Sequence, residues 1–171
     1  MNRKAPNQVR IIGGSWRSRI IEFPDSTGLR PTPDRVRETV FNWLRQHLDG
    51  KMCLDLFAGS GALGFEALSR GAAEVVMVEQ SSIVARGLKE NAQLLGANNA
   101  TVVNANAMQY LRGTARPFDV VFLSPWRAPD AKVYAESELN FAPSPDWKIL
   151  KQSRAGQVKF QIMTPIRAEE I

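Results

Sequence analysis

The sequence predicts an α/β protein in which a mostly parallel sheet carries helices on both faces. From residue 51 to residue 123, short apolar runs alternate with amphipathic segments of helical length, and such alternation gives parallel strands joined by covering helices. Gly71 and Gly96 follow two of the expected helices, where a glycine commonly ends a helix. The expected elements are strands at 51–57, 74–79, 100–104 and 118–123, and helices at 62–70, 82–96 and 106–112.

The N-terminal region is expected to be a basic extension, residues 1–32, ahead of a domain at 33–171. Two apolar runs, 9–12 and 16–23, flank a glycine turn, which is typical of a β-hairpin. Trp16 stands at this turn. It either stacks on an RNA base or packs the hairpin onto the body of the protein.

A helix is expected after this extension. Apolar residues recur at helical spacing from Pro33 to about Leu48, with Thr32 as the cap and Pro33 at the first helical position. His47 would then lie near the end of the helix, where a positive charge is favourable. This explains His47 better than a catalytic role.

The C-terminal part predicts three further strands, at 132–137, about 146–152 and 156–164. The last of them alternates apolar and polar residues regularly. We expect the last two to form an antiparallel hairpin at or near the edge of the sheet.

The composition is that of one globular domain with a full core, since 44% of the 171 residues are hydrophobic and 23% are charged. No stretch approaches the roughly 20 apolar residues of a membrane span, and the first residues lack the apolar core of a secretion signal. The single cysteine, Cys53, lies in an apolar run and is expected to be buried. We expect a cytoplasmic protein without a membrane partner, and, with one Cys and one His, without a metal.

The net charge of +5 has its source in the N-terminal region. Residues 1–37 hold eight Lys or Arg against three acidic residues, and the remaining chain holds equal numbers of each sign. A basic stripe beside a ligand-binding body suggests a polyanionic substrate. The alternative is a solvated basic arm.

Residues 53–64 predict a site for a small ligand. An apolar strand ends in Asp55, a glycine-rich loop follows, and a helix begins at about Ala62. Such a loop lets the backbone approach a ligand and presents unpaired N–H groups. Glu79 ends the next strand, where an acid that binds a ribose is expected.

This spacing fits either a dinucleotide or S-adenosylmethionine. Asp55 would repel a pyrophosphate and attract the methionine ammonium, which favours S-adenosylmethionine. Polar residues at the carboxyl ends of the expected strands are interpreted as one site, because ligands bind there in such sheets. These residues are Asp55, Glu79, Asn104, Asn106 and Ser124.

Three groups of motifs occur together in this order: residues 10–14 (Arg-Ile-Ile-Gly-Gly), 29–32 (Leu-Arg-Pro-Thr) with 34–39 (Asp-Arg-Val-Arg-Glu-Thr), and 55–64 (Asp-Leu-Phe-Ala-Gly-Ser-Gly-Ala-Leu-Gly). In them the chain closely resembles the RsmD family, bacterial enzymes that methylate the exocyclic N2 of one guanine in 16S ribosomal RNA. The likeness covers nearly the whole chain. The N-terminal motifs are specific to this family, whereas the glycine loop is shared by most S-adenosylmethionine methyltransferases.

The resemblance implies a Rossmann-like class I methyltransferase fold, S-adenosylmethionine as the cofactor, and a monomer that acts on small-subunit ribosomal RNA, free or within an assembling 30S subunit. The residues implied to bind the cofactor are Asp55, Phe57, Gly59, Gly61, Glu79, Asn106 and Ala107. The residues implied to grip RNA are Arg10, Arg17, Arg19, Arg30, Arg35 and Arg37.

The catalytic motif of this family is absent from the sequence. Members carry Asp-Pro-Pro and an aromatic residue directly after the strand that corresponds to residues 118–123. The resemblance implies that this Asp and a backbone carbonyl accept the N–H bonds of the guanine amino group, while the aromatic ring stacks on the extruded base. Here Leu123 is followed by Ser124, Pro125 and Trp126, so no catalytic residue is assigned.

The connection at this point is also too short for the expected topology. Only residues 124–131 separate strand 118–123 from strand 132–137, whereas parallel neighbours need a crossover of a dozen or more residues. Either these strands are not parallel neighbours, or a loop and a helix are missing between them, which we favour.

Two other functions remain open. If the segment is truly deleted, the chain would be a catalytically inactive RNA-binding module of ribosome assembly. A nicotinamide-dependent oxidoreductase is the other alternative, and it would have to place its pyrophosphate next to Asp55.

Overall fold

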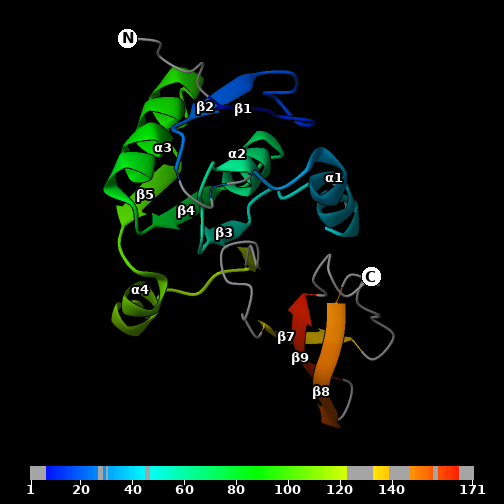
Figure 1. Cartoon of the computed structure of the whole chain (residues 1–171). Coiled ribbons are helices and arrows are strands. Elements are labelled where there is room, and N and C mark those ends of the chain that lie inside the picture. Colours follow the sequence, from blue (N-terminus) through cyan, green and yellow to red (C-terminus); the bar gives the residue numbers. More distant parts are fainter. Residues whose placement is uncertain are drawn as a thin grey trace. The chain divides into compact units, whose positions relative to one another are not determined.

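The computed structural model (Figure 1) describes residues 7–26, 29, 31–44, 47–122, 133–138, 147–155 and 158–165. The chain divides into two compact units, residues 1–124 and residues 125–171. The first unit contains both the N-terminal strands and the parallel sheet. The division into an extension at 1–32 and a domain at 33–171 stays a prediction.

A four-stranded parallel sheet forms the centre of the first unit. The strand order β5-β4-β3-β6 and the parallel pairing of all neighbours confirm the predicted α/β class. The direction of the chain across the sheet reverses after β5, because β6 lies on the other side of β3, and ligands bind outside the carboxyl ends at such a reversal. The strands are β3 (Met52–Asp55), β4 (Glu74–Glu79), β5 (Ala100–Asn104) and β6 (Val120–Phe122).

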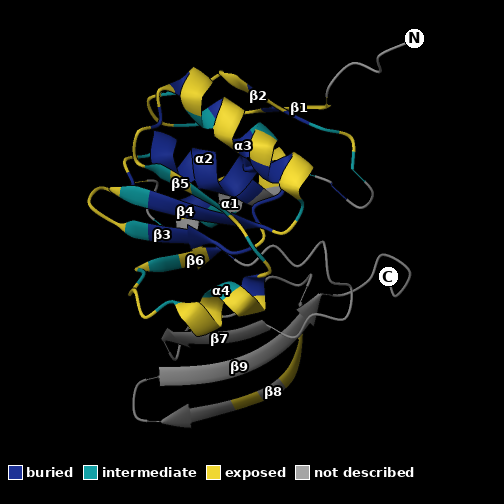
Figure 2. Ribbon diagram, turned by 90° about the vertical axis from the view of Figure 1, so that its left-hand side faces the viewer, coloured by how far each residue is buried: buried dark blue, intermediate teal, exposed yellow. Residues whose placement is uncertain are grey.

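Helices cover both faces of this sheet, as predicted. α2 and α3 lie on one face and α4 on the other (Figure 2). Cys53 and Val75 join the larger core with α2 and α3, whereas Leu54 and Val76 join a smaller cluster with Ala107 of α4, because successive side chains of a strand point to opposite faces. The helices are α2 (Ala62–Ser69), α3 (Ser82–Leu95) and α4 (Ala107–Gly113).

The predicted N-terminal β-hairpin is present as the antiparallel pair β1 (Asn7–Arg10) and β2 (Ile20–Phe23). The second strand begins later than predicted, because residues 15–18 form a turn. Val9 and Ile21 are buried in the same hydrophobic core as the residues of α2 and α3. The hairpin therefore shares the core of the parallel sheet.

α1 (Asp34–Trp43) is shorter than predicted. Pro33 takes the capping position, and no side chain caps the helix, so the prediction of Thr32 as the cap is wrong. His47 lies beyond the last helical residue and is exposed. It is therefore not a charge at the helix end.

The second unit contains an antiparallel sheet in the order β7-β9-β8. β8 and β9 form the predicted C-terminal hairpin, but they belong to a sheet separate from the parallel one, in which β9 lies between β7 and β8, so the predicted position at the edge of the parallel sheet is wrong. β6 and β7 belong to different sheets, so in this chain they are not parallel neighbours. The connection at 124–131 lies outside the described residues. The strands are β7 (Val133–Glu138), β8 (Trp147–Ala155) and β9 (Val158–Pro165).

In the described part of the chain, no helix has the length and apolar character needed to cross a membrane.

Candidate functional site

The carboxyl ends of three neighbouring strands bring polar residues together. Asp55 ends β3, Glu79 ends β4 and Asn104 ends β5. The side-chain amide of Asn104 donates to the backbone oxygens of Glu79 at 2.8 Å and of Gln80 at 2.9 Å, which fixes the loop after β4. Ser124, which the sequence placed in the same group, lies outside the described residues.

The loop between β3 and α2 depends on glycine. Gly59 and Gly61 have φ angles of +54° and +79°, in the left-handed region that side chains disfavour. A Cβ on Gly61 would also lie 2.6 Å from the ring of Phe65. A Cβ on Gly64 would lie 2.7 Å from the sulfur of Met77. The glycines therefore permit both the turn and the close approach of α2 to the sheet.

Asp55 lies at the base of this loop and is 1% exposed. Its Oδ2 accepts a hydrogen bond from the N–H of Gly64 at 3.1 Å, whereas its buried Oδ1 has no hydrogen-bond partner among the described residues. Burial raises the pKa of Asp55 to about 7, and the charge of Glu79 adds to the rise, while the backbone N–H groups of Gly64 and Phe57 act in the opposite direction. A buried carboxylate oxygen without a partner costs free energy, so this atom is a candidate for contact with a cationic ligand.

Glu79 is 2% exposed and holds the loops that follow β3 and β4. Its Oε2 accepts from the N–H of Gly59 at 2.9 Å, and its Oε1 accepts from the N–H of Ser81 at 2.9 Å. The carboxylate thereby fixes the glycine loop beside the end of β4. This is where the sequence predicts a ribose-binding acid.

The other predicted cofactor residues have visible structural roles. Asn106 caps α4, because its Oδ1 accepts from the N–H of Met108 at 2.9 Å. Ala107 is buried in the smaller core cluster, and Phe57 is 36% exposed in the glycine loop. Contacts of these three residues with a cofactor stay predictions.

The hydrogen-bond acceptors at these strand ends fit S-adenosylmethionine. The unpartnered Oδ1 of Asp55 suits its ammonium group. The buried carboxyl groups of Asp55 and Glu79, which interact electrostatically, would oppose the pyrophosphate of a dinucleotide.

The basic residues of the hairpin region lie on the surface. Arg10, Arg17, Arg19 and Arg35 are exposed, whereas Arg30 lies outside the described residues. One guanidinium nitrogen of Arg19 donates to the backbone oxygen of Leu94 in α3 at 2.9 Å. RNA contacts by these exposed arginines stay predictions.

Trp16 is half-buried and packs against the core of the first unit. Of the two roles that the sequence left open for it, the structure shows the packing of the hairpin.

Arg37 contradicts the prediction of an RNA contact. Its side chain is 0% exposed. Nη1 lies 3.2 Å from Oε2 of Glu66, Nε donates to the backbone oxygen of Thr32 at 3.2 Å, and the guanidinium also pairs with Asp34. A guanidinium enclosed in this way cannot reach a phosphate, so the predicted RNA contact is wrong.

Glu66, the partner of Arg37, is a residue that the sequence reasoning missed. It is 0% exposed within α2, a helix that is buried along its entire length. A signal was available, because Glu66 is the only charged residue between Leu56 and Ser69. A single charge in an apolar helix indicates a buried partner.

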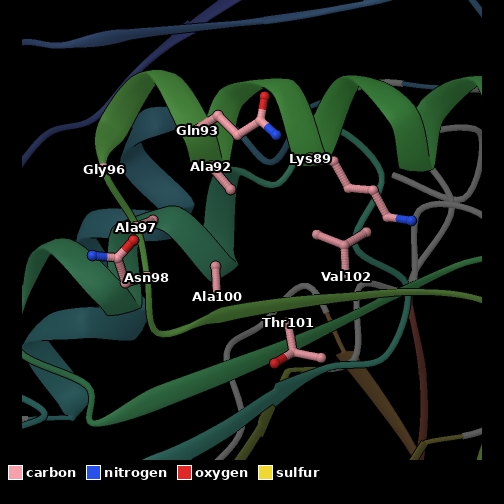
Figure 3. A pocket seen from close by; sticks show the side chains of 9 residues that line it. All are labelled: Lys89, Ala92, Gln93, Gly96, Ala97, Asn98, Ala100, Thr101 and Val102. Atoms are coloured by element: carbon pink, nitrogen blue, oxygen red, sulfur yellow. The ribbon is translucent and has the colours of Figure 1, made fainter.

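A pocket of about 640 Å³ opens between α3 and β5 (Figure 3). Lys89 and Gln93 of α3 and Val102 of β5 are among the residues that line it. The described residues on its wall include none of the predicted cofactor residues. It is therefore distinct from the candidate cofactor site.

Comparisons with known proteins show which proteins this chain is similar to. The ribosomal RNA small subunit methyltransferase D of Escherichia coli (strain K12) is 43% identical, and the alignment covers 94% of this chain and 92% of that protein. The solved structure of the Escherichia coli protein yhhF is 41% identical, has a TM-score of 0.64, and covers 93% of this chain and 98% of its own. The C-terminal domain of precorrin-6Y C5,15-methyltransferase from Rhodobacter capsulatus, at 14% identity and a TM-score of 0.52 over 80% of this chain and 91% of its own, shows a shared fold alone.

The alignment with methyltransferase D extends over 182 positions, which is more than the 171 residues of this chain. That relative therefore has residues for which this chain has no counterpart. A family model described as "Conserved hypothetical protein 95" matches residues 9–132. With this match and the identity to methyltransferase D, the chain belongs to the family of Conserved hypothetical protein 95, the RsmD family.

Proposed function

We propose that this chain transfers a methyl group from S-adenosylmethionine to the exocyclic N2 of a guanine in small-subunit ribosomal RNA. The observation that carries the proposal is the buried Oδ1 of Asp55, which has no partner among the described residues and lies at the base of a loop with two left-handed glycines. The ammonium of the methionine part would supply the partner that this oxygen lacks. The family and the fold support the same function.

The predicted cofactor residues divide by the part of the molecule that they would hold. Asp55, Gly59 and Gly61 would hold the methionine part, Glu79 the ribose hydroxyls, and Asn106 with Ala107 the adenine. Phe57 would contact the cofactor from the glycine loop. When bound, S-adenosylmethionine supplies an activated methyl group, and the residues of this chain orient it. Positioning of this kind can account for a large part of a rate enhancement.

The exposed arginines of the hairpin region support RNA as the substrate. Arg10, Arg17 and Arg19 lie on or beside the hairpin, and Arg35 lies in α1. A guanidinium fork matches the geometry of a phosphate. We infer that these residues, together with Arg30, contact the RNA backbone. We place the reaction in the bacterial cytoplasm, with the protein acting as a monomer and without a metal.

The test is methylation of defined substrates. The protein is incubated with radiolabelled S-adenosylmethionine and either transcribed 16S ribosomal RNA or 30S subunits assembled on that RNA, and the digested nucleosides are analysed by mass spectrometry. Label in N2-methylguanosine is the expected result. Label in another nucleoside would overturn the guanine N2 assignment, and the difference between the two substrates shows which one the protein recognises.

A catalytically inactive RNA-binding module is the second candidate. The absence of Asp-Pro-Pro after Leu123 favours it. Binding of S-adenosylhomocysteine and of RNA without any methyl transfer would identify such a module. Binding of a reduced nicotinamide cofactor, followed by its fluorescence, would instead identify an oxidoreductase.

A further inference from the structure

The carboxylate of Glu66 collects hydrogen bonds from three separate parts of the first unit. Its Oε1 accepts from the N–H of Gly13 at 2.8 Å and from Nε of Arg70 at 2.9 Å. Its Oε2 accepts from the N–H of Ile12 at 3.0 Å and from Nη1 of Arg37 at 3.2 Å. One buried side chain of α2 thus binds the loop of the basic hairpin, helix α1 and the end of α2 itself.

Ser69, at the end of α2, forms a second attachment to the same loop. Its hydroxyl donates to the backbone oxygen of Gly13 at 2.6 Å and accepts from the N–H of Trp16 at 2.9 Å. Its backbone oxygen accepts from the N–H of Ser15 at 2.7 Å. A Cβ on Gly14 would lie 1.9 Å from that oxygen. The hairpin loop before Arg17 therefore packs directly against the end of α2.

The glycine loop, where the cofactor is proposed to bind, leads directly into the N-terminal end of α2. The helix begins after Gly61, and the N–H of Gly64 donates to Asp55. Every residue of α2 is buried, and a close-packed interior transmits displacements instead of absorbing them. A shift of the hairpin would therefore move the residues that surround Asp55.

We propose that Glu66 is a positioning residue that couples RNA binding at the hairpin to cofactor binding at the glycine loop. The motif at 10–14 and Arg37 of the motif at 34–39 meet at this carboxylate, so they fasten the hairpin loop and α1 to the same point of α2. A ligand that orders one end of this assembly reduces the ordering cost for a ligand at the other end, which gives positive coupling. This inference rests on the proposed function, because it requires both ligands.

The experiment measures the Kd of S-adenosylhomocysteine by calorimetry, without RNA and with a saturating fragment of 16S ribosomal RNA. It does not depend on methyl transfer. In the unmodified protein we expect RNA to tighten the binding by about fivefold or more, within the usual range of coupling between sites. In Glu66→Gln, which has similar size but removes the charge that holds Arg37 and Arg70, we expect the two Kd values to agree within about twofold.

Glu74→Gln is the matched control. Glu74 also pairs with an arginine, Arg116, at 2.6 Å, but this pair is partly exposed and lies at the start of β4. The same chemical change there should leave the effect of RNA on the Kd unchanged.

The outcomes separate the inference from the proposed function. If the unmodified protein binds both ligands without coupling, or if Glu66→Gln retains the full coupling, the inference is wrong and the proposed function stands. If either ligand fails to bind, the proposed function fails and the inference fails with it. If Glu66→Gln does not fold, Glu66→Asp decides, because it keeps the charge that pairs with Arg37 and Arg70 but shortens the side chain that reaches the N–H groups of Ile12 and Gly13. Coupling that stays at the unmodified level in Glu66→Asp would overturn the inference.

Discussion

The N–H of Gly64 donates to Oδ2 of Asp55 at 3.1 Å, while Oδ1 of the same carboxyl group is buried without a partner among the described residues. One oxygen therefore ties α2 to the end of β3, and the other stays available at the base of the glycine loop. A half-satisfied buried carboxyl group lowers stability. It is retained where the proposed cofactor would place its ammonium.

Replacement of Asp55 by Asn should separate cofactor binding from folding. The side-chain oxygen of Asn can still accept a hydrogen bond from the N–H of Gly64, but Asn has no charge to pair with the ammonium. We therefore expect S-adenosylhomocysteine to bind at least about tenfold more weakly, which corresponds to the free energy of one charge-assisted hydrogen bond. The free energy of unfolding at pH 8 should be unchanged or higher, because a buried charge has been removed. Calorimetry and urea unfolding measure the two quantities. An unchanged Kd would contradict the proposed role.

The binding of the cofactor should depend on pH through the same residue. Burial raises the pKa of Asp55 to about 7 in the folded protein, and an unfolded chain has an ordinary Asp pKa of about 4. The folded protein therefore keeps a proton that the unfolded chain has lost between about pH 4 and pH 7. The contribution of Asp55 to the free energy of unfolding falls as the pH rises through this window and is constant above it.

Because the ammonium group of the ligand binds the ionised form of Asp55, the affinity for S-adenosylhomocysteine should change in the opposite sense. We expect it to rise with pH up to about pH 7, by at most about tenfold per pH unit, and to level off above that value. Kd values between pH 5.5 and pH 8, measured by calorimetry, show this profile. The Asp55→Asn variant should lack the rise, and a rise that persists in it would assign the titration to another group.

The regular part of the fold could be predicted because its sequence signals are local. The predicted bounds of β4 and β5 agree with the structure residue by residue, since both are short apolar runs bounded by turn residues. The glycine loop and the acidic strand ends at Asp55 and Glu79 were found for the same reason. Helix ends were harder, as the end of α1 at Trp43 shows, because no strong stop signal follows it.

The role of Arg37 could not be read from its neighbours in the sequence. It lies off the apolar stripe of α1, which is typical of a surface residue, and its buried partner Glu66 is 29 positions away. Only tertiary packing brings the two side chains together. A charged residue that is fully buried is rare unless it is paired, so the apolar surroundings of Glu66 were the better indicator.

Replacement of Glu79 by Gln should weaken cofactor binding through the ribose. The N–H groups of Gly59 and Ser81 each donate to one carboxylate oxygen, and the amide nitrogen of Gln would face one of these donors. We expect a loss of stability of about 1–3 kcal/mol and weaker binding of S-adenosylhomocysteine. If Glu79 holds the ribose hydroxyls, an analogue without them should bind the variant and the unmodified protein with similar affinity. A persistent difference would argue against the ribose contact.

Two glycines with similar backbone angles form a matched pair that tests how closely the hairpin loop packs on α2. Gly14 and Gly50 have φ angles of +76° and +74°, but a Cβ on Gly14 would lie 1.9 Å from the backbone oxygen of Ser69, whereas a Cβ on Gly50 would meet nothing within 4 Å. Gly50→Ala should therefore cost about 1–2 kcal/mol from backbone strain alone. Gly14→Ala should cost more than about 3 kcal/mol, because the loop must also leave α2. Urea unfolding measures both, and equal losses would show that the loop is not seated as described.

The intact mass of the protein purified from its natural gene tests whether the crossover after β6 exists. The printed sequence corresponds to 19.0 kDa, and methyltransferase D of Escherichia coli aligns over 182 positions, more than this chain contains. If a loop and a helix belong between β6 and β7, the mass should exceed 19.0 kDa by roughly 2–3 kDa, the mass of about 20 residues, which is enough for a helix of ordinary length and its loop. Peptide mapping after Leu123 should then find the Asp-Pro-Pro motif.

A mass equal to 19.0 kDa would mean a true deletion. The same protein should then bind S-adenosylhomocysteine through Asp55 and Glu79, since both residues precede the deletion, while showing no methyl transfer to 16S ribosomal RNA. Binding without turnover would favour the RNA-binding module, because the residues that activate the guanine amino group would be absent and no residue between Phe122 and Val133 offers a carboxylate other than Asp130. Turnover at the unchanged mass would instead point to the carboxylate of Asp130, and Asp130→Asn should then abolish it.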